Sequence, residues 1–582
     1  MHKQTIITLI LSTLSILLYA QINFEEVAQD VGLENVSFGS NIFGNGGISF
    51  YDFDNDGWDD ISMATSAGDT ILFFRNNNGL FEKVEPAFVS NTGQIKHILW
   101  ADYNNDGNPD LFVTTDRNGN SLYKNTGSLN FVDVTSQVGI STDSMATMGA
   151  AWGDINNDGW LDLAIANFGT IDSVGTLLYL NDGQGSFTDI TEQANIFDTQ
   201  KPSFGMVFSD LNGDGYQDMY FSVDHFFGNS VYLNNGDLSF EDVTQTCGGG
   251  LEMYAMCIAA GDYDNDGVED FYFTSMPPDG AFLSRCSGNG TFNEVSVEAG
   301  VNWQSDGWGS IWLDGDLDGD LDLFVNGQVP AGTAFDVSIF YENMGDGTFT
   351  ELVGSNIDND VARSFANAVG DFNNDGLPDF VVLNGEEYNI TLWENTTSTN
   401  NGFLKVDLKG VESNRDGIGS WIEVYTDTLS QFRYTHCANG YLAQNMGYEL
   451  FGLEKHEIID SVKVRWLSGM VDVLYNVLPN QKITVTEGET SSTTGIGKYN
   501  SSVVRIYPNP ASDLIHIISS DKSLILTGLK VFDVSGREIE VAFEIQSGSS
   551  IIVNTSTLKN GSYYLQLLHK NGKITKQIII AN

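Results

Sequence analysis

The sequence predicts an all-β protein: a seven-bladed β-propeller with calcium loops, followed by a small β domain and a C-terminal Ig-like β-sandwich. Three observations predict this fold. A nine-residue acidic motif occurs seven times at nearly constant spacing, short apolar runs flank its copies, and the composition changes near residue 399. The 62 glycines indicate many turns. Because helical periodicity is absent, we expect four-stranded blades rather than a helical solenoid.

The repeated motif reads Asp-x-Asp/Asn-x-Asp-Gly-x-x-Asp. Its copies begin at Asp52, Asp102, Asp154, Asp210, Asp262, Asp314 and Asp371, so they stand 50, 52, 56, 52, 52 and 57 residues apart. Insertions fall between copies and never within one, which indicates one supersecondary unit built seven times. Each unit reads as four strands: one before the motif, one directly after it, and two joined by a tight turn such as Asn-x-Gly.

The two ends of the array predict that it closes on itself. The last unit has no fourth strand, whereas residues 23–33 (NFEEVAQDVGL) parallel the fourth-strand segment 130–140 (NFVDVTSQVGI) of another unit. An open array has no reason to move one strand from its end to its start. A ring does, because the displaced strand completes the last blade and removes an exposed sheet edge.

The motif itself has the chemistry of a calcium loop. Oxygen-bearing side chains stand at positions 1, 3, 5 and 9, glycine at position 6 permits a sharp bend, and position 7 is expected to contribute its backbone carbonyl. The alternative, acidic turns without metal, leaves several carboxylates in one turn repelling one another. We therefore predict up to seven Ca²⁺ ions. The predicted metal ligands are Asp52, Asp54, Asp56, Trp58, Asp60, Asp102, Asn104, Asp106, Asn108, Asp110, Asp154, Asn156, Asp158, Trp160, Asp162, Asp210, Asn212, Asp214, Tyr216, Asp218, Asp262, Asp264, Asp266, Val268, Asp270, Asp314, Asp316, Asp318, Asp320, Asp322, Asp371, Asn373, Asp375, Leu377 and Asp379.

These motifs resemble the FG-GAP/VCBS repeats, whose propeller is shared with integrin α-subunits. The resemblance covers the predicted propeller, residues 21–398. It implies that each loop joins the first and second strands of a blade and holds calcium for stability. It also implies that partners bind on the face opposite the loops.

Two smaller β domains are predicted after the propeller. In residues 399–487, the segments NRDGIGS, CANGY and VRWLSG resemble the ASPIC/UnbV domain, which follows FG-GAP repeats in relatives of cartilage acidic protein. Residues 488–503 are a predicted linker. In residues 504–582, YPNP, VFDVSGR and LKNGSYY resemble the type A sorting domain of the type IX secretion system. An ordinary Ig-like binding module is the alternative for this last segment.

Composition and the N-terminus predict an exported protein. Residues 1–20 read as a signal peptide, with Lys3 ahead of an apolar stretch from residue 6 to residue 19. We expect a secreted or outer-surface protein, handled by the type IX machinery, with no transmembrane segment in the mature chain. The net charge of −52 argues against nucleic-acid binding, which needs a basic surface. Four cysteines are too few for a disulfide framework, although Cys247 and Cys257 could bridge.

The sequence favours a binder of extracellular glycan or protein over an enzyme, because no nucleophile elbow, HExxH motif or phosphate loop is present. The variable connections opposite the loops carry the candidate ligand contacts Phe226, Phe227, Tyr254, Trp303 and Trp308. Packing of Trp308 between blades is the alternative for that residue. The second hypothesis is a calcium-dependent polysaccharide lyase or hydrolase, whose candidate cationic groups are Lys96, His97, Arg117, His225 and Arg363.

Overall fold

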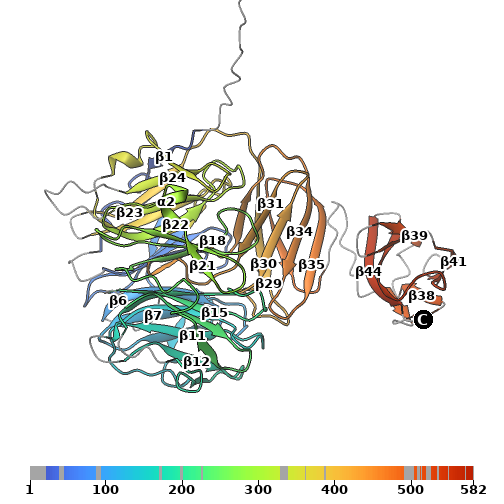
Figure 1. The fold of residues 1–582 in the computed structure, drawn as a ribbon, viewed down its shortest axis with the longest axis horizontal. Helices are drawn as coiled ribbons and strands as arrows, with labels where there is room; N and C mark the ends of the chain where they lie inside the picture. Colours follow the sequence, from blue (N-terminus) through green and yellow to red (C-terminus); the bar gives the residue numbers. More distant parts are fainter. Residues whose placement is uncertain are drawn as a thin grey trace, which may run out of the picture.

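The computed structural model describes residues 21–38, 45–86, 93–169, 174–196, 201–224, 227–327, 338–360, 362–385, 388–489 and, with short gaps, 504–580. The predicted signal peptide, residues 1–20, and most of the predicted linker lie outside these residues. Nearly all described elements are β-strands (Figure 1). Two short helical turns, α2 (Ser296–Ala299) and η1 (Ile357–Asn359), lie between strands. The described residues include no helix with the length and apolarity needed to span a bilayer.

Seven antiparallel sheets, numbered 1 to 7 here, follow one another within the described part of residues 21–398. Sheet 1 has β2 (Ile48–Tyr51), β3 (Asp60–Met63), β4 (Leu72–Asn76) and β5 (Phe81–Val84). Sheet 2 has β6 (Gln94–Ala101), β7 (Asp110–Asp116), β8 (Ser121–Asn125) and β9 (Phe131–Asp133). Sheet 3 has β10 (Thr147–Gly153), β11 (Asp162–Asn167), β12 (Leu177–Asn181) and β13 (Phe187–Asp189). Sheet 4 has β14 (Ser203–Ser209), β15 (Asp218–Val223), β16 (Ser230–Asn234) and β17 (Phe240–Asp242).

The remaining sheets follow the same order. Sheet 5 has β18 (Ile258–Gly261), β19 (Asp270–Phe273), β20 (Phe282–Cys286) and β21 (Phe292–Glu294). Sheet 6 has β22 (Gly307–Leu313), β23 (Asp322–Gly327), β24 (Ile339–Asn343) and β25 (Phe349–Glu351). Sheet 7 has β26 (Ser364–Gly370), β27 (Asp379–Asn384), β28 (Thr391–Asn395) and, from the other end of the chain, β1 (Phe24–Glu26).

The sheets form a closed ring. The first strand of each sheet contacts the first strand of the next, and β26 of sheet 7 contacts β2 of sheet 1. The strand β1 pairs antiparallel with β28, with Phe24 opposite Asn395 and Glu26 opposite Trp393. The strand predicted to complete the last unit therefore does so. As a result, sheet 7 has no unpaired outer edge at β28.

Aromatic side chains pack neighbouring sheets together. The residue at position 2 of a motif stacks on the tryptophan in the first strand of the following sheet: Phe53 on Trp100 at 5.2 Å, and Tyr103 on Trp152 at 6.1 Å, between ring centroids. All four side chains are buried. Large aromatic rings bury much apolar area at little entropic cost, so this repeated contact contributes to the core of the ring.

The second domain has two sheets with an apolar core between them. One sheet consists of β33 (Glu449–Gly452), β29 (Phe403–Lys409) and β36 (Gln481–Thr486). The other consists of β31 (Ser430–Tyr434), β30 (Trp421–Tyr425), β34 (Ile459–Arg465) and β35 (Val471–Val477). A further strand, β32 (Ala443–Gln444), leaves this domain and pairs in parallel with β2 of the ring. Residues 437–446, which contain β32, are called the finger below.

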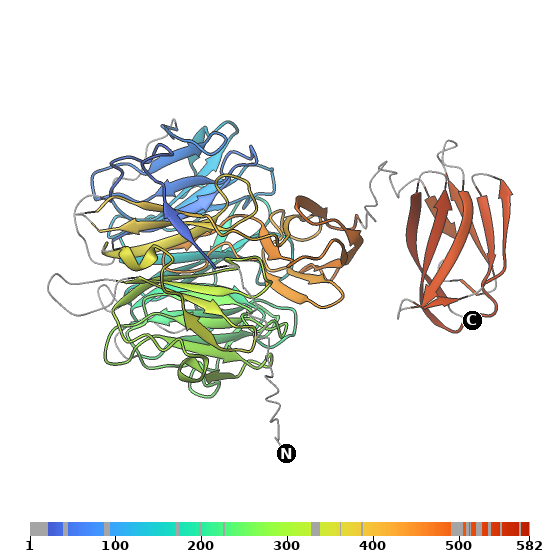
Figure 2. The same ribbon diagram turned by 90° about the horizontal axis from the view of Figure 1, so that it is seen from above.

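The third domain also has two four-stranded sheets around its own core. One consists of β37 (Val504–Tyr507), β38 (Leu514–Ser519), β42 (Ser550–Asn554) and β41 (Phe543–Ser547). The other consists of β40 (Glu538–Ile539), β39 (Leu526–Asp533), β43 (Gly561–His569) and β44 (Gly572–Ile580). Figures 1 and 2 show it as a separate body beyond the second domain.

The four cysteines form no disulfide bond. Cys247, Cys257, Cys286 and Cys437 are free and buried, so the possible bridge between Cys247 and Cys257 is not formed.

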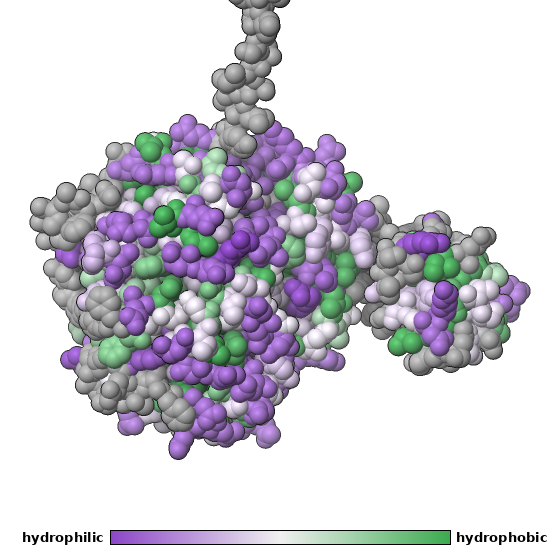
Figure 3. Space-filling view, viewed as in Figure 1, coloured by the Kyte–Doolittle hydropathy of each residue, from purple (hydrophilic) through white to green (hydrophobic). Residues whose placement is uncertain are grey.

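Polar side chains cover most of the face shown in Figure 3, with apolar residues scattered among them. This surface agrees with a net charge of −52.

Candidate metal loops and ligand face

The seven acidic motifs form seven loops of the same geometry, numbered 1 to 7 with their sheets. In each loop, the carboxylate at position 1 accepts hydrogen bonds from the backbone N–H groups of positions 5 and 6. In loop 1 these are Asp56 N to Asp52 Oδ1 at 3.0 Å and Gly57 N to Asp52 Oδ2 at 2.8 Å, and the other six loops repeat the pair. The backbone N–H of position 7 donates to the carboxylate at position 5 in every loop. Each loop is thereby folded around its own carboxylates.

The aspartate at position 9 begins the second strand of every sheet and turns back towards the loop. Its Oδ1 accepts from the backbone N–H of the last residue of the third strand, for example from Asn76 to Asp60 at 2.7 Å. Burial is the main cause that raises the pKa of this group, to about 9 for Asp60 and to about 8 for Asp110 and Asp218. The neighbouring carboxylates of the loop raise it further. These buried charges are therefore poorly compensated by the protein alone.

Three loops bring three carboxylate oxygens within 4.8 Å of one another. They are Asp52, Asp54 and Asp60 in loop 1, Asp262, Asp264 and Asp270 in loop 5, and Asp314, Asp316 and Asp318 in loop 6. The other four loops have asparagine at position 3 (Asn104, Asn156, Asn212 and Asn373), whose carboxamide can offer an oxygen instead. A donor set of carboxylate and carboxamide oxygens in a tight loop fits a hard cation such as Ca²⁺. The residues present therefore fit the metal that the sequence predicts.

Basic side chains reach some of these carboxylates. Arg75 Nε lies 2.7 Å from Asp54 Oδ2 in loop 1, and Arg285 Nη2 lies 2.6 Å from Asp264 Oδ2 in loop 5. Both arginines are about half-exposed, so solvent screens these pairs. They reduce the negative charge of the loops only in part.

Sequence reasoning missed the residue at position 4 of the motif. In five loops it is asparagine with a left-handed backbone, and its side-chain amide donates to the carbonyl at position 6 of the next loop. Examples are Asn105 to Gly159 at 2.9 Å and Asn157 to Gly215 at 2.9 Å. The bond from Asn374 to Gly57 joins loop 7 to loop 1. The recurrence of Asn before Asp-Gly was the signal, because asparagine tolerates a positive φ and carries a donor.

The second domain covers the face of the ring that carries the loops, called the loop face. Lys405 Nζ lies 2.6 Å from Asp371 Oδ2 of loop 7, and both side chains are buried. His436 Nε2 lies 2.7 Å from Oε1 of Glu269, which is position 8 of loop 5. At loop 3, a Cβ on Gly159 would stand 2.2 Å from the Glu412 carbonyl oxygen, so only glycine permits this close approach.

The finger enters the centre of the ring from the loop face. Gln444 Nε2 donates to the Trp100 carbonyl at 2.7 Å, and the Trp100 N–H donates to Gln444 Oε1 at 2.7 Å. Farther in, the buried ring of Tyr441 packs against Trp308 at 5.1 Å and Phe204 at 5.9 Å, between centroids. The finger thus contacts sheets on several sides of the ring, and its polar backbone groups find partners there.

Two of the five predicted ligand contacts are buried in the structure. Trp303 and Trp308 are 5% and 6% exposed, so neither indole offers a face to a ligand. Trp308 packs against Phe365 of the ring and against Tyr441 of the second domain. This matches the alternative that Trp308 is a packing residue, with the second domain as an additional partner. Phe227 is 46% exposed and Tyr254 is half-buried. Phe226 lies outside the described residues.

Two of the five cationic groups that the enzyme hypothesis named, Lys96 and His97, are buried, whereas Arg363 is half-buried. Lys96 is buried and donates to the Asn45 carbonyl at 2.7 Å, and burial lowers its pKa to about 8. His97 is buried, lies 3.2 Å from the Ala443 carbonyl of the finger, and has its pKa lowered to about 4 by burial. Arg117 is exposed beside Asp116, and His225 lies outside the described residues. Lys96 and His97 are therefore packing residues beside the finger.

Comparison with known families assigns the three parts of the chain. FG-GAP-like repeats match residues 52–113, 102–165 and 210–273, the family described as ASPIC and UnbV matches residues 410–492, and the secretion system C-terminal sorting domain matches residues 505–581. The chain therefore carries FG-GAP-like repeats, an ASPIC and UnbV domain and a sorting domain, as the motifs indicated. A sorting domain of this kind implies handling by the type IX secretion system and points to secretion or to the outer cell surface.

Individual relatives match the chain over only part of their own length. The chain is 25% identical over 433 residues to cartilage acidic protein 1 of Mus musculus, covering 72% of this chain and 56% of that protein. It is 24% identical over 454 residues to the Homo sapiens protein, covering 75% and 57%. The chain thus spans little more than half the length of these relatives. A similar solved structure is that of YCF48 from Cyanidioschyzon merolae, at a TM-score of 0.39 and 11% identity, covering 64% of this chain and 98% of that chain.

Proposed function

We propose that this protein is a secreted or surface-bound binding module: a seven-bladed propeller, residues 21–398, that holds up to seven Ca²⁺ ions and binds an extracellular glycan or protein. The observation that carries the calcium assignment is that all seven loops repeat the same hydrogen bonds around their position 1 carboxylates. In three of these loops, three carboxylate oxygens also lie within 4.8 Å of one another. When bound, Ca²⁺ would supply charge compensation at the position 1, 3, 5 and 9 side chains. The protein's part is to hold those oxygens in place through the backbone donors of each loop.

We further propose that the other two parts serve architecture and export. The second domain, residues 399–487, would be a permanent cover of the loop face, because its contacts with the loops are buried and include an ion pair. The third domain, residues 504–582, would be a β-sandwich of Ig-like type that acts as the export address after the linker 488–503. Residues 1–20 would be removed as a signal peptide. Binding or adhesion would then belong to the face opposite the loops.

Calcium counting tests this proposal. The full-length chain, freed of metal and titrated with Ca²⁺ by calorimetry, should bind up to seven ions and should respond poorly to Mg²⁺, which prefers octahedral sites with retained waters. Asp270→Asn, at position 9 of loop 5, should lower the count by about one site. Asp242→Asn is the matched control, because Asp242 is exposed and outside the loops. A chain that binds no Ca²⁺ would refute the metal assignment.

The second candidate function is a calcium-dependent polysaccharide lyase or hydrolase, and we propose that the protein is not one. The burial of Lys96 and His97 beside the finger supports a binder, because a lyase needs an accessible base and cations to hold a uronate. Release of unsaturated or reducing sugars from uronic-acid polymers by the calcium-loaded chain would decide for the enzyme.

A further inference from the structure

The next-to-last residue of the third strand, called the third-strand residue below, stands beside the metal loop of its own sheet. Its charge differs from sheet to sheet. It is basic in sheets 1, 2 and 5 (Arg75, Lys124 and Arg285), leucine in sheets 3 and 4 (Leu180 and Leu233), and acidic in sheets 6 and 7 (Glu342 and Glu394). Since the seven loops share their backbone hydrogen bonds, this residue is a source of difference between them.

The basic third-strand residues pair with loop carboxylates, as described above for loop 1. Lys124 Nζ lies 3.2 Å from Asp106 Oδ2 in loop 2. Arg285 Nη2 lies 2.6 Å from Asp264 Oδ2 and 3.2 Å from Asp266 Oδ2 in loop 5. A positive charge this close to the loop oxygens repels a bound cation and competes for its ligands. The basic residues should therefore lower the affinity of loops 1, 2 and 5 for Ca²⁺.

The arginine of loop 5 does not take the place of an ion. Asp270 is fully buried, and its Oδ2 accepts no hydrogen bond from the described residues. In five other loops the equivalent oxygen accepts from the backbone N–H at position 2. Asp270 also places a carboxylate oxygen within 4.8 Å of oxygens of Asp262 and Asp264. A buried carboxylate oxygen without a donor indicates that a cation completes this loop.

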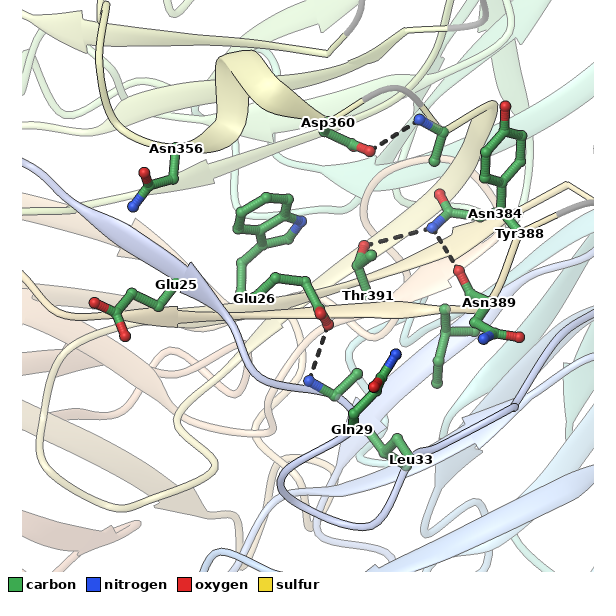
Figure 4. A pocket seen from close by; sticks show the side chains of 14 residues that line it. Glu25, Glu26, Gln29, Leu33, Asn356, Asp360, Asn384, Tyr388, Asn389 and Thr391 are labelled. Atoms are coloured by element: carbon green, nitrogen blue, oxygen red, sulfur yellow. Dashed lines mark hydrogen bonds between the residues drawn. The ribbon is translucent and has the colours of Figure 1, made fainter.

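The acidic third-strand residues add to the negative charge of loops 6 and 7. Burial is the main cause that raises the pKa of Asp316 to about 6, and Glu342 is the next cause, so the two carboxylates lie close together. In loop 7, Glu394 Oε1 accepts from Asn373 Nδ2 at 3.2 Å. Glu394 also lies directly opposite Glu25 of β1, which lines a cavity of about 600 Å³ formed by segments around β1, η1 and β28 (Figure 4). Both acidic residues should therefore favour a cation in their loops.

Loop 6 has the strongest negative charge. Its motif has aspartate at positions 1, 3, 5, 7 and 9, and Glu342 is a sixth carboxylate. Burial and then the neighbouring Asp316 raise the pKa of Asp314 to about 7, although Arg433 of the second domain acts to lower it. One basic side chain thus acts against six carboxylates. Because the charge of the ligands tunes the Kd of calcium loops, loop 6 should bind Ca²⁺ most tightly.

Loop 2 is the opposite extreme. Its motif has aspartate at positions 1, 5 and 9 and Asn104 at position 3. Besides Lys124, Arg415 of the second domain reaches this loop, with its Nε 3.5 Å from Asp102 Oδ2. Asp416 adds one carboxylate, which accepts from the Asp102 N–H at 2.8 Å. Two basic side chains thus act against four carboxylates, so loop 2 should bind Ca²⁺ most weakly.

We propose that the third-strand residue sets the calcium affinity of its loop, so that loop 6 fills at the lowest free Ca²⁺ and loop 2 at the highest. This inference rests on the proposed function, in which the loops hold Ca²⁺, and it ranks those ions. Loop 6 also contacts the second domain, where Asn401 Nδ2 donates to the Asp316 carbonyl at 2.9 Å and the Glu454 N–H donates to the Leu317 carbonyl at 2.9 Å. Its ion would stabilise this junction at calcium concentrations too low for loop 2.

The test measures Ca²⁺ bound to the full-length chain by equilibrium dialysis at controlled free Ca²⁺. We expect Kd values that spread over at least about a hundredfold. Asp322→Asn should remove the ion that binds first, and Asp110→Asn the ion that binds last. Glu342→Gln should weaken the first ion about tenfold, and Arg285→Gln should strengthen a later ion about tenfold. These last two variants leave every predicted metal ligand in place.

Glu298→Gln and Arg117→Gln are the matched controls, because they make the same charge changes at exposed residues in the connections after β21 and β7, away from the loops. They should leave every Kd unchanged, and melting curves in saturating Ca²⁺ show that each variant is folded. Equal Kd values for all ions, an unchanged first ion in Glu342→Gln, or equal effects of Arg285→Gln and Arg117→Gln would each overturn the ranking and leave the calcium assignment standing. A chain that binds no Ca²⁺ would instead refute the proposed function.

Discussion

The two faces of the ring differ in how they are built. On the loop face, seven loops repeat the same hydrogen bonds, adjacent loops are tied through asparagines, and a second domain covers them. The opposite face carries connections of different length, and beside sheet 7 these leave a cavity with polar walls. The loop face is thus uniform and the opposite face varied. Under the proposed function, the metal would stabilise the protein at the uniform face and the ligand would bind at the varied one.

Removal of calcium should produce the largest effect, because it acts on all seven loops at once. If free Ca²⁺ stands at about 100 times Kd, each site stabilises the fold by about 2.7 kcal/mol. We expect chelation to lower the melting temperature strongly, with recovery on added Ca²⁺ and little recovery on added Mg²⁺. Differential scanning calorimetry checks this, and an unchanged melting curve would show that the loop face does not depend on metal.

Loss of the closing strand should be the next largest effect. Deletion of residues 23–33 removes β1, which pairs with β28, and leaves β28 as an unpaired sheet edge. We expect aggregation or loss of cooperative unfolding, measured by size-exclusion chromatography and urea titration. Deletion of residues 572–580, the edge strand β44 of the third domain, is the comparison and should leave unfolding of the ring unchanged. A monomeric, fully stable ring without β1 would contradict closure.

These two predictions concern features that could be predicted from the sequence, because each feature depends on a short stretch of residues. Ligand positions, strand periodicity and the displaced strand at 23–33 each depend on short patterns that repeat. The finger occurs only once in the sequence. CANGY at residues 437–441 could therefore be recognised as a family motif, but its contact with sheets 4 and 6 could not be predicted. For the same reason Trp308 looked like a loop aromatic although Tyr441 covers it. The cavity beside sheet 7 depends on three distant stretches and had no local signal.

The finger supplies a third prediction, since it contacts several sheets from the centre of the ring. Tyr441 is 1% exposed and packs against Trp308 and Phe204, so Tyr441→Ala should cost about 3–5 kcal/mol, as for other large buried aromatics. Tyr475→Ala, at a residue 52% exposed on the second domain, should change stability by less than about 0.5 kcal/mol. Equal urea midpoints for the two variants would mean that the finger does not anchor the second domain.

The ion pair on the loop face should be sensitive to metal. Lys405 compensates Asp371, which is also a predicted ligand of loop 7. Without Ca²⁺, Lys405→Met leaves a buried charge uncompensated and should cost about 3–5 kcal/mol. With Ca²⁺ bound, the ion compensates the same carboxylate, and the cost should fall to about 1 kcal/mol. Thermal melts of the variant and parent, with and without chelator, check the difference. A cost independent of calcium would mean that loop 7 holds no ion.

The smallest effect should come from a single bond between loops. Asn157 Nδ2 donates to the Gly215 carbonyl at 2.9 Å, and its φ is 57°. Asn157→Gly keeps the left-handed backbone and removes the amide. Asn78→Gly, at φ 54°, makes the same backbone change at a turn where the amide contacts only its exposed neighbour Asn77.

The difference between these two variants isolates the contact between loops 3 and 4 and should be about 1 kcal/mol. Urea unfolding in calcium measures it. Asn157→Ala should cost more than Asn157→Gly, because alanine disfavours a positive φ. If Asn157→Gly and Asn78→Gly lose the same stability, the asparagines serve only the local turn. Each loop would then fold independently, and the covering second domain alone would couple the loop face.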